Sequence, residues 1–313
     1  MTTPNASPST IFVLSDMRSG STLVDQLLGA HPGIMSVGEL HWLDAYVLQD
    51  RSIYNPVHEL ICTCGQGVGD CSFWAQVAVA LGRPLESLCL RPSFVEWNRS
   101  SSPWSRLRRV PTQWVDRLPA LFRHSIVQRL FQGPRLAQDS IDLFNAVHEV
   151  SGRQFVIDSS KSPFRFRAVY DAQPTRTCAL ILARDYRAVV YSKMKRGHSL
   201  EAAAIGWRKK MTQIEALTGD LPPGRKYRLK YEDLCDNPAQ ELTRICAFLG
   251  LAFSPVMLAR PTDDIHHIGG SPSKFDPSRT AISMDTAYQQ AFDPRALATL
   301  RDLVGNVAER WGY

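Results

Sequence analysis

The hydrophobic pattern of this 313-residue chain alternates between short apolar runs and longer stretches of helical periodicity. Short runs of strand length, bounded by small or polar residues, are typical of buried β-strands. The pattern predicts four strands, at residues 10–14, 154–157, 177–183 and 226–230. Each is followed by a polar turn and a helical segment, so the chain repeats a strand–turn–helix unit.

This repeat predicts an α/β fold. Strands that alternate with helices form parallel sheets whose two faces are covered by helices. We therefore expect a central parallel sheet of about four or five strands with helices on both faces. In such sheets the functional residues gather at the carboxyl ends of the strands, so the turns after the strands are the first places to search.

Two segments interrupt the repeat. Residues 52–135 contain no clear strand and are rich in Trp, Arg and Pro, which predicts a helical insertion. Residues 253–292 are rich in Pro, Ser, Asp and Gly, which predicts a long loop. A loop of that length is usually a lid, a binding element or disordered. No domain boundary is evident, so residues 1–313 are predicted to form a single domain.

The net charge of the chain favours one class of binding partner but does not identify it. The net charge of +6 and the isoelectric point near 9.0 favour an anionic partner, and nucleic acid, an acidic membrane or a polyanionic small molecule would all fit. Residues 1–10 are polar and no long apolar run occurs, which predicts no signal peptide and no transmembrane segment. Seven unevenly spread cysteines favour a reducing cytoplasm.

The turn after the first strand predicts an anion site. Arg18-Ser19-Gly20-Ser21-Thr22 precedes a helix, where backbone N–H groups and the helix dipole favour an anion. Arg18 adds a fixed positive charge, and Gly20 permits close approach of the backbone. A tight turn with a Ser/Thr helix cap is the alternative. The loop lacks the leading glycine and the lysine of nucleoside-triphosphate loops, which argues against ATP or GTP.

These residues resemble the sulfotransferases that use 3′-phosphoadenosine 5′-phosphosulfate (PAPS). Met17–Leu23 is similar to their 5′-phosphosulfate loop, with Met17 where the family usually has proline, and His31-Pro32 closes the next helix. The similarity spans most of the chain and is greatest to the Golgi-type branch that includes tyrosylprotein sulfotransferases, and to bacterial relatives. It implies a P-loop-like sheet. The loop residues that it assigns to PAPS are Arg18, Ser19, Gly20, Ser21 and Thr22.

The same resemblance implies that Glu39, in Gly38-Glu39-Leu40, is the general base. In the similar enzymes a glutamate at this place takes the proton of the acceptor as sulfur is attacked. His41 is the rival base. An acidic residue that only offsets a helix dipole is the structural alternative for Glu39.

Lys161 follows the second predicted strand, in a stretch that resembles the family's Lys-x-Pro segment. The resemblance implies that Lys161 acts with Arg18 to stabilise charge on the departing phosphate. A solvated lysine is the alternative. Asp158 is expected to cap a helix or to hold Lys161.

The strongest similarity, to the family's 3′-phosphate segment, follows the third strand. Arg184 stands at the strand end, where a guanidinium can grip a phosphate with two hydrogen bonds. The resemblance places Ser192 on the same phosphate, which requires the turn at Asp185-Tyr186 to bring the two together. Arg187 and Lys193 are expected to be exposed helix residues.

A later stretch resembles the Gly-rich loop that closes over the adenosine and 3′-phosphate, so the resemblance makes the 253–292 loop a cofactor cover. The residues that it assigns to the cofactor here are Gly269, Gly270, Ser271 and Lys274. By contrast, residues 230–251 are similar to a structural stretch of the family, and their expected role is packing.

Cys62, Cys64 and Cys71 also resemble a feature of bacterial sulfotransferases. With His58 they offer four soft ligands within 14 residues, so a structural zinc is possible. A disulfide and free thiols remain as alternatives. No catalytic role follows from any of them.

Together the motifs predict a sulfotransferase that moves a sulfuryl group from PAPS to an acceptor hydroxyl or amine by in-line displacement and releases 3′,5′-adenosine diphosphate. No metal is expected in the reaction, because fixed cations supply the positive charge. The rivals are a nucleotide or small-molecule kinase and a non-catalytic adenosine-phosphate binding protein.

The acceptor is expected to be a small molecule, lipid, sugar or peptide, and no nucleic-acid partner is expected. The oligomeric state is left open by the sequence. Aromatic residues of the insertion could line an acceptor pocket, although such residues more often form core. These residues are Phe73, Trp74, Trp97, Trp104, Trp114, Phe122 and Phe131.

Overall fold

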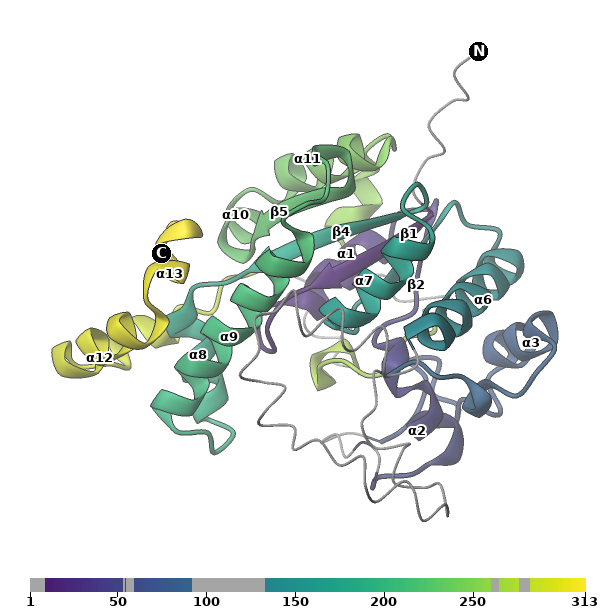
Figure 1. The fold of residues 1–313 in the computed structure, drawn as a ribbon, viewed down its shortest axis with the longest axis horizontal. Helices are drawn as coiled ribbons and strands as arrows, with labels where there is room; N and C mark the ends of the chain where they lie inside the picture. Colours follow the sequence, from purple (N-terminus) through teal and green to yellow (C-terminus); the bar gives the residue numbers. More distant parts are fainter. Residues whose placement is uncertain (1–8, 53, 55–58, 92–132, 260–264, 276–281) are drawn as a thin grey trace.

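The computed structural model describes residues 9–52, 54, 59–91, 133–259, 265–275 and 282–313, which Figure 1 shows as a ribbon. Within these residues, five parallel strands form one sheet in the order β2-β3-β1-β4-β5. The strands are β1 (Thr10–Leu14), β2 (Ile34–Ser36), β3 (Phe155–Asp158), β4 (Thr177–Ala183) and β5 (Lys226–Lys230). The predicted α/β fold with a parallel sheet is confirmed.

Strand β2 is missing from the sequence prediction. It is only three residues long, so it carries too few positions to show a strand period. Ile34 pairs with Phe155 and Ser36 pairs with Ile157, which adds β2 to the edge of the sheet beside β3. This short strand ends three residues before Glu39, so β2 places that carboxylate at the carboxyl edge of the sheet.

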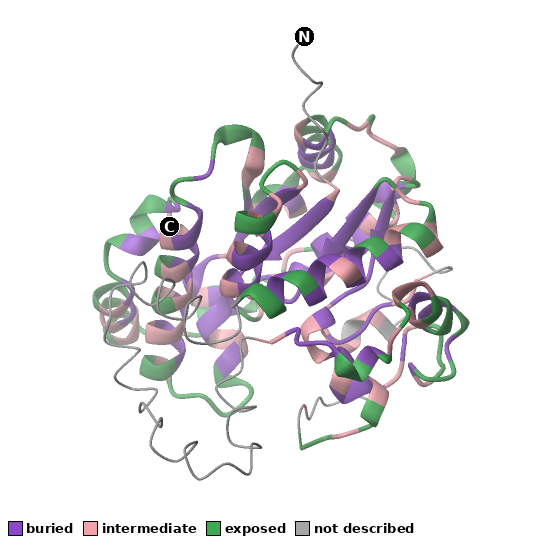
Figure 2. Cartoon of the chain, turned by 45° about the vertical axis from the view of Figure 1, so that its right-hand side comes forward, coloured by how far each residue is buried: buried purple, intermediate pink, exposed green. Residues whose placement is uncertain are grey.

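Helices cover both faces of the sheet, as the sequence predicts. Alternate residues of β1 enter different cores: Phe12 packs in one hydrophobic cluster and Ile11 in the other. Trp207 of α9 (Leu200–Thr218) belongs to the cluster of Phe12, whereas Leu27 of α1 (Ser21–Gly29) belongs to that of Ile11. Figure 2 shows the strands buried between these layers.

The remaining helices divide between the two layers. The layer of Phe12 also contains side chains of α2 (Leu43–Leu48), α3 (Ser72–Leu81), α6 (Gly133–Ser151), α7 (Pro163–Ala172), α8 (Tyr186–Met194), α12 (Pro294–Val304) and α13 (Asn306–Arg310). The layer of Ile11 also contains side chains of α10 (Tyr231–Asp236) and α11 (Pro238–Leu249).

The structure describes parts of the two segments that interrupt the repeat. In the predicted insertion it places α3, which packs against α6, and the short turn Leu85–Ser87. Residues 92–132, about half of the predicted insertion, lie outside the described residues. In the 253–292 loop it places three 3₁₀ turns, Pro255–Leu258, Pro272–Phe275 and Ala287–Gln290. Ile268 of this loop forms a parallel bridge with Gly38.

A buried ion pair ties the end of β3 to the helical layer. Arg165 of α7 is fully buried, and its guanidinium donates to the carboxylate of Asp158 and, at 2.9 Å, to Ser140 Oγ. The guanidinium carbon lies 5.7 Å from the ring of Phe12 and 5.3 Å from that of Phe144. Asp158 therefore holds Arg165, and among the contacts found here it does not hold Lys161 as the sequence suggested.

We predict that Arg165→Met lowers the free energy of unfolding by about 3–5 kcal/mol, because it leaves the carboxylate of Asp158 buried without its partner charge. Arg310→Met, which breaks a half-exposed pair with Glu215, should cost under about 1 kcal/mol. Urea unfolding of both variants measures the difference. Equal costs would show that the Asp158 pair does not stabilise the fold.

Candidate active site

The turn between β1 and α1 has the geometry of an anion-binding loop. Gly20, the N-cap of α1, has a left-handed backbone with φ of 91°, and no side chain caps the helix. The amide of Leu23 donates to the carbonyl of Gly20 at 2.9 Å, and the two amides before it are placed to bind an anion. A Cβ on Gly20 would lie 2.3 Å from Cδ2 of Tyr231. Glycine is therefore required both by the backbone conformation and by the ring that packs on it.

Arg18 joins this loop to the β4–α8 segment. Its Nε donates to Ser192 Oγ at 2.9 Å, and its carbonyl accepts from Arg184 Nη1 at 3.2 Å. Arg184 and Ser192 thus meet around Arg18, although Arg184 precedes α8 and Ser192 lies near the end of that helix. The structure brings together the two segments that the sequence assigned to the 5′ and 3′ ends of the donor.

Tyr231 is a site residue that sequence reasoning missed. It begins α10 directly after β5, and its ring lies 4.5 Å below the guanidinium carbon of Arg184 while its edge meets Gly20. An aromatic ring in this place orients the guanidinium through a cation–π contact. The sequence offers one indication of this role, because Tyr231 directly follows a predicted strand and functional residues gather at the carboxyl ends of parallel strands. The sequence analysis expects only a packing role for residues 230–251.

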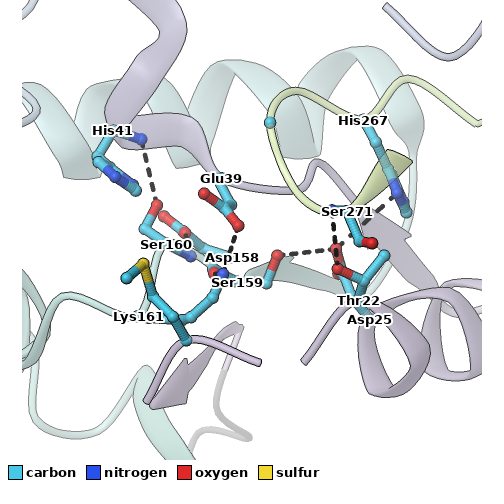
Figure 3. A network of polar contacts seen from close by, with 12 residues as sticks. Thr22, Asp25, Glu39, His41, Asp158, Ser159, Ser160, Lys161, His267 and Ser271 are labelled. Carbon is cyan, nitrogen blue, oxygen red and sulfur yellow. Dashed lines mark hydrogen bonds and ion pairs between the residues drawn. The ribbon is translucent and has the colours of Figure 1, made fainter. Parts of the chain in front are cut away.

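Glu39 and Lys161 form an ion pair at the same edge of the sheet, and both side chains are largely buried. Figure 3 shows the two groups pointing toward each other. The Nζ of Lys161 also donates to the carbonyl of Ser159 at 3.1 Å. Lys161 is thus a held, partly buried cation and not a solvated lysine.

Arg18 and Lys161, the two cations expected at the phosphosulfate, both have a left-handed backbone conformation. Among the described non-glycine residues only three have a positive φ: Arg18 at 69°, Lys161 at 57° and Gln49 at 54°. Gln49 is a helix C-cap, where this conformation is common. Left-handed backbone costs an ordinary residue roughly 1–2 kcal/mol and concentrates at functional sites.

His41 lies beside this pair but is a weak base. Its amide donates to Ser160 Oγ, and its buried ring nitrogen Nδ1 has no hydrogen-bond partner among the described residues. Burial, followed by the charges of Lys161 and Arg165, lowers the pKa of His41 well below its usual value. The ring therefore stays neutral and holds a proton poorly.

The Gly-rich loop closes over Glu39. The amide of Glu39 donates to the carbonyl of Ile268 at 2.6 Å, and a Cβ on Gly269 would lie 2.7 Å from Cβ of Glu39. The amide of Ser271 donates to Thr22 Oγ1 at 3.2 Å, which links this loop to the anion-binding loop (Figure 3). Gly270 faces the same Thr22 hydroxyl.

Lys274 turns back toward this loop and donates to the carbonyl of Gly269. Burial lowers the pKa of Lys274 to about 8, partly offset by the nearby charge of Glu39. All cofactor-binding residues predicted from the sequence therefore lie at one edge of the sheet.

Lys193 is buried, which corrects the expectation that it is an exposed helix residue. Its ammonium pairs with the buried carboxylate of Asp16 beneath the anion-binding loop. Arg187, by contrast, is partly exposed and pairs with Asp185. The ion pair with Asp16, which is remote in the sequence, compensates the charge of Lys193 inside the fold.

Asp25 is a second buried group that the sequence did not single out. Its carboxylate accepts from Ser36 Oγ and, at 2.9 Å, from Ser159 Oγ, and His267 Nδ1 lies 3.9 Å away (Figure 3). Burial raises the pKa of Asp25 to about 7, with a smaller contribution from Asp158. The group lies under the site and supports the β2 and β3 ends.

The cysteines gather with a histidine that the sequence did not pair with them. The atoms of Cys62, Cys64, Cys71 and His266 that could bind a metal all lie within 4.8 Å of one another. All three thiols are free, and His58 lies outside the described residues. Phe73 and Trp74 are buried beside this cluster and form core; the other aromatic candidates are not described.

A parallel sheet with an anion-binding loop after its central strand and several cations at the same edge is typical of proteins that bind anionic nucleotides. The model of the sulfotransferase family matches residues 83–255, more than half of the chain. The chain belongs to the sulfotransferase family.

Relatives in two organisms agree with this assignment. The chain is 22% identical to carbohydrate sulfotransferase 6 of Homo sapiens over 345 residues, covering 97% of this chain and 80% of that protein. It is 29% identical to a putative protein-tyrosine sulfotransferase of Caenorhabditis elegans over 133 residues, covering 40% of this chain and 51% of that protein.

Solved structures share the fold. The sulfotransferase domain from the curacin biosynthetic pathway superposes with a TM-score of 0.58 and 19% identity, covering 98% of both chains. The sulfotransferase domain of the Synechococcus PCC 7002 olefin synthase gives a TM-score of 0.52 and 20% identity, covering 100% of this chain and 98% of that one. No described helix is long and apolar enough to cross a membrane.

Asp25 predicts a distinct dependence of stability on pH. Its pKa is about 7 in the folded state and near 3.8 when exposed, so between these values only the folded state keeps the proton. The free energy of unfolding should fall as pH rises from about 4 to about 7 and then level, by roughly 4 kcal/mol at most, since one pKa unit is about 1.4 kcal/mol.

Urea unfolding at several pH values measures this slope. Asp25→Asn should remove it, because the amide does not titrate, whereas Asp302→Asn, at an exposed position of α12, should keep it. The charged groups that act on Asp25 include Asp158, Lys161 and Lys274. His267 also lies beside Asp25, and burial keeps it neutral with a pKa of about 3. An unchanged slope in Asp25→Asn would assign the pH dependence to another group.

Proposed function

We propose that this sulfotransferase takes its sulfuryl group from PAPS and transfers it to an acceptor hydroxyl or amine. The observation that supports this most is the meeting of three predicted parts at one edge of the sheet. These parts are the anion-binding loop, the Arg184–Ser192 pair around Arg18, and the Glu39–Lys161 ion pair. They are far apart in the sequence, and the parallel sheet brings them to the edge where the functional residues of such sheets gather.

The buried polar atoms of the site fit an anionic donor. Ser19 Oγ and Arg184 Nε are buried, and neither has a hydrogen-bond partner in the described part of the chain. Donors in this state are rare in folded proteins and suit a ligand that supplies acceptor oxygens. The anion-binding loop with Arg18 and Lys161 would hold the phosphosulfate end, and Arg184 with Ser192 would hold the 3′-phosphate.

PAPS, when bound, would supply the sulfuryl group and leave as 3′,5′-adenosine diphosphate. The chain would contribute positioning and fixed positive charge, which are the main sources of catalysis when a charged group passes between two oxygens. Lys161 pairs with Glu39 here and would also face the departing phosphate, so the ion pair holds both side chains in one place.

Glu39 is the better candidate for the base. Its carboxylate lies beside Lys161 and under the Gly-rich loop, at the edge where the donor would bind. The lowered pKa of His41 makes it a poor proton acceptor. We therefore assign proton removal from the acceptor to Glu39.

The acceptor and the location stay proposals. The similar proteins are named for carbohydrate and protein-tyrosine acceptors, which favours a hydroxyl group as the nucleophile. A sugar, peptide, lipid or small molecule remains compatible with that chemistry. The reducing cytoplasm is proposed from the uneven spread of the seven cysteines along the sequence.

Membership of the family favours sulfuryl over phosphoryl transfer and so weakens the kinase alternative. A non-catalytic binding protein remains the rival. It would need Arg184 and the anion-binding loop, but it would have no use for a buried Glu39–Lys161 pair.

The nucleotide clamp predicts a preference for the 3′-phosphate. Wild-type protein should bind 3′,5′-adenosine diphosphate at least about tenfold more tightly than 5′-AMP, since a hydrogen bond to a charged group contributes roughly 1.5–3 kcal/mol. Arg184→Ala should abolish the preference, while Arg187→Ala, which removes a neighbouring arginine paired with Asp185, should keep it. Calorimetric titration measures the affinity of each protein for the two nucleotides. Equal affinities in the wild type would contradict the assignment of PAPS as the donor.

The base assignment predicts that Glu39→Gln lowers kcat by about 10² to 10⁴ with labelled donor. Affinity for 3′,5′-adenosine diphosphate should change little, because the carboxylate acts on the acceptor. His41→Ala is the matched control and should retain most of the rate. If the His41 variant lost the rate and the Glu39 variant kept more than about a tenth of it, His41 would be the base.

A further inference from the structure

Three sulfur atoms and one imidazole nitrogen converge beside the Gly-rich loop. His266 Nδ1 lies 3.3 Å from Cys71 Sγ and 3.6 Å from Cys62 Sγ. Cys71 Sγ lies 3.6 Å from Cys64 Sγ and 3.8 Å from Cys62 Sγ. The histidine comes from a segment 195 residues after Cys71, so the fold and not the local sequence assembles this group.

These distances are those of a tetrahedral metal site. A zinc ion bound at about 2.3 Å by sulfur and about 2.0–2.1 Å by nitrogen separates its sulfur ligands by about 3.8 Å and sulfur from nitrogen by about 3.5 Å. The four separations given above lie close to these values, and the remaining two pairs of ligand atoms lie within 4.8 Å of each other. Ligand atoms this close together leave room for a single ion.

The backbone around the group is already built to hold it. Gly65, with φ of 86°, closes a tight turn after Cys62-Thr63-Cys64, in which the amide of Gly65 donates to the carbonyl of Cys62 at 2.9 Å. Cys71 is the N-cap of α3, so the start of this helix fixes the position of its backbone. These features orient the three sulfurs before any metal binds.

His266 is oriented as well. Its ring stacks on Phe73 with centroids 4.6 Å apart and planes at 6°. Thr63 Oγ1 donates to the carbonyl of Ile265 at 2.6 Å and accepts from the amide of His267 at 2.9 Å, so it fixes the backbone on both sides of His266. Such outer contacts are typical of metal ligands, which they hold in the required direction.

We propose that Cys62, Cys64, Cys71 and His266 bind one structural zinc ion. Four protein ligands close the coordination sphere, so the metal would have no open position for catalysis. A disulfide would use two of the sulfurs and leave the third beside the imidazole, which gives no reason for four groups to converge.

The zinc would fix the Gly-rich loop to the body of the protein. His266 is two residues before Ile268, whose carbonyl accepts from the amide of Glu39, and three before Gly269, which packs on that side chain. Losing the metal should therefore loosen the loop over Glu39. If the proposed function is right, affinity for 3′,5′-adenosine diphosphate should fall as well, and this one consequence rests on that proposal.

The metal content of the purified full chain tests the site without relying on activity. Wild-type protein from zinc-supplemented cells, kept reduced, should contain about one equivalent of zinc by mass spectrometry of the metal. Cys64→Ser and His266→Ala should lose most of it, whereas His266→Cys should keep it, since four thiolates also bind zinc. Cys235→Ser and His198→Ala, which alter a cysteine and an exposed histidine elsewhere, should match the wild type.

Cobalt gives a second readout that does not depend on the stability of a variant. Wild-type protein stripped with a mercurial, reduced and reloaded with Co²⁺ should show the sulfur-to-cobalt charge transfer and strong visible bands of a tetrahedral thiolate site. The proposal would be overturned by reduced wild-type protein that holds no zinc and binds no Co²⁺. A disulfide among these cysteines in protein isolated with thiols trapped, or zinc retained by Cys64→Ser and His266→Ala alike, would also overturn it.

Discussion

The parallel pairing of β1 with β3 on one side and β4 on the other is the constraint on which the site depends. Parallel strands end at the same edge of a sheet, so the turns that follow them are brought together however far apart they lie in the sequence. The turn after β1 supplies the anion-binding loop, that after β3 supplies Lys161, and that after β4 supplies Arg184. The short β2 then adds Glu39 from the edge.

Positively charged side chains are concentrated at this edge of the sheet, and buried carboxylates compensate part of their charge. Lys161 pairs with Glu39, Lys193 with Asp16, and the amine of Lys210 reaches the carbonyl of Lys161 at 3.4 Å. Burial, together with the charges of Lys161 and Lys193, lowers the pKa of Lys210. Cations that are crowded and withdrawn from water attract an anionic ligand strongly, because its charge offsets their desolvation.

A second set of contacts connects the loop at 265–274 to the rest of the chain. The bridge of Ile268 with Gly38 and the bond from Ser271 to Thr22 hold its later part over Glu39 and α1. The cluster around His266 holds its earlier part against the 62–71 segment. A loop fixed at both ends can cover a ligand without a large loss of chain entropy on binding.

Local sequence determined four of the five described strands, the helices after them and the anion-binding loop, because hydrophobic period and turn chemistry are properties of neighbouring residues. The family resemblance added Glu39, Lys161, Arg184 and Ser192, all of which lie at one edge of the sheet. Only the tertiary structure decided what depends on contacts between distant segments. It buried Lys193 against Asp16, set Tyr231 between Gly20 and Arg184, and chose His266 for the cysteines. No local pattern encodes these pairings, since each arises where the packing of the sheet and its helices leaves two remote side chains in the same space.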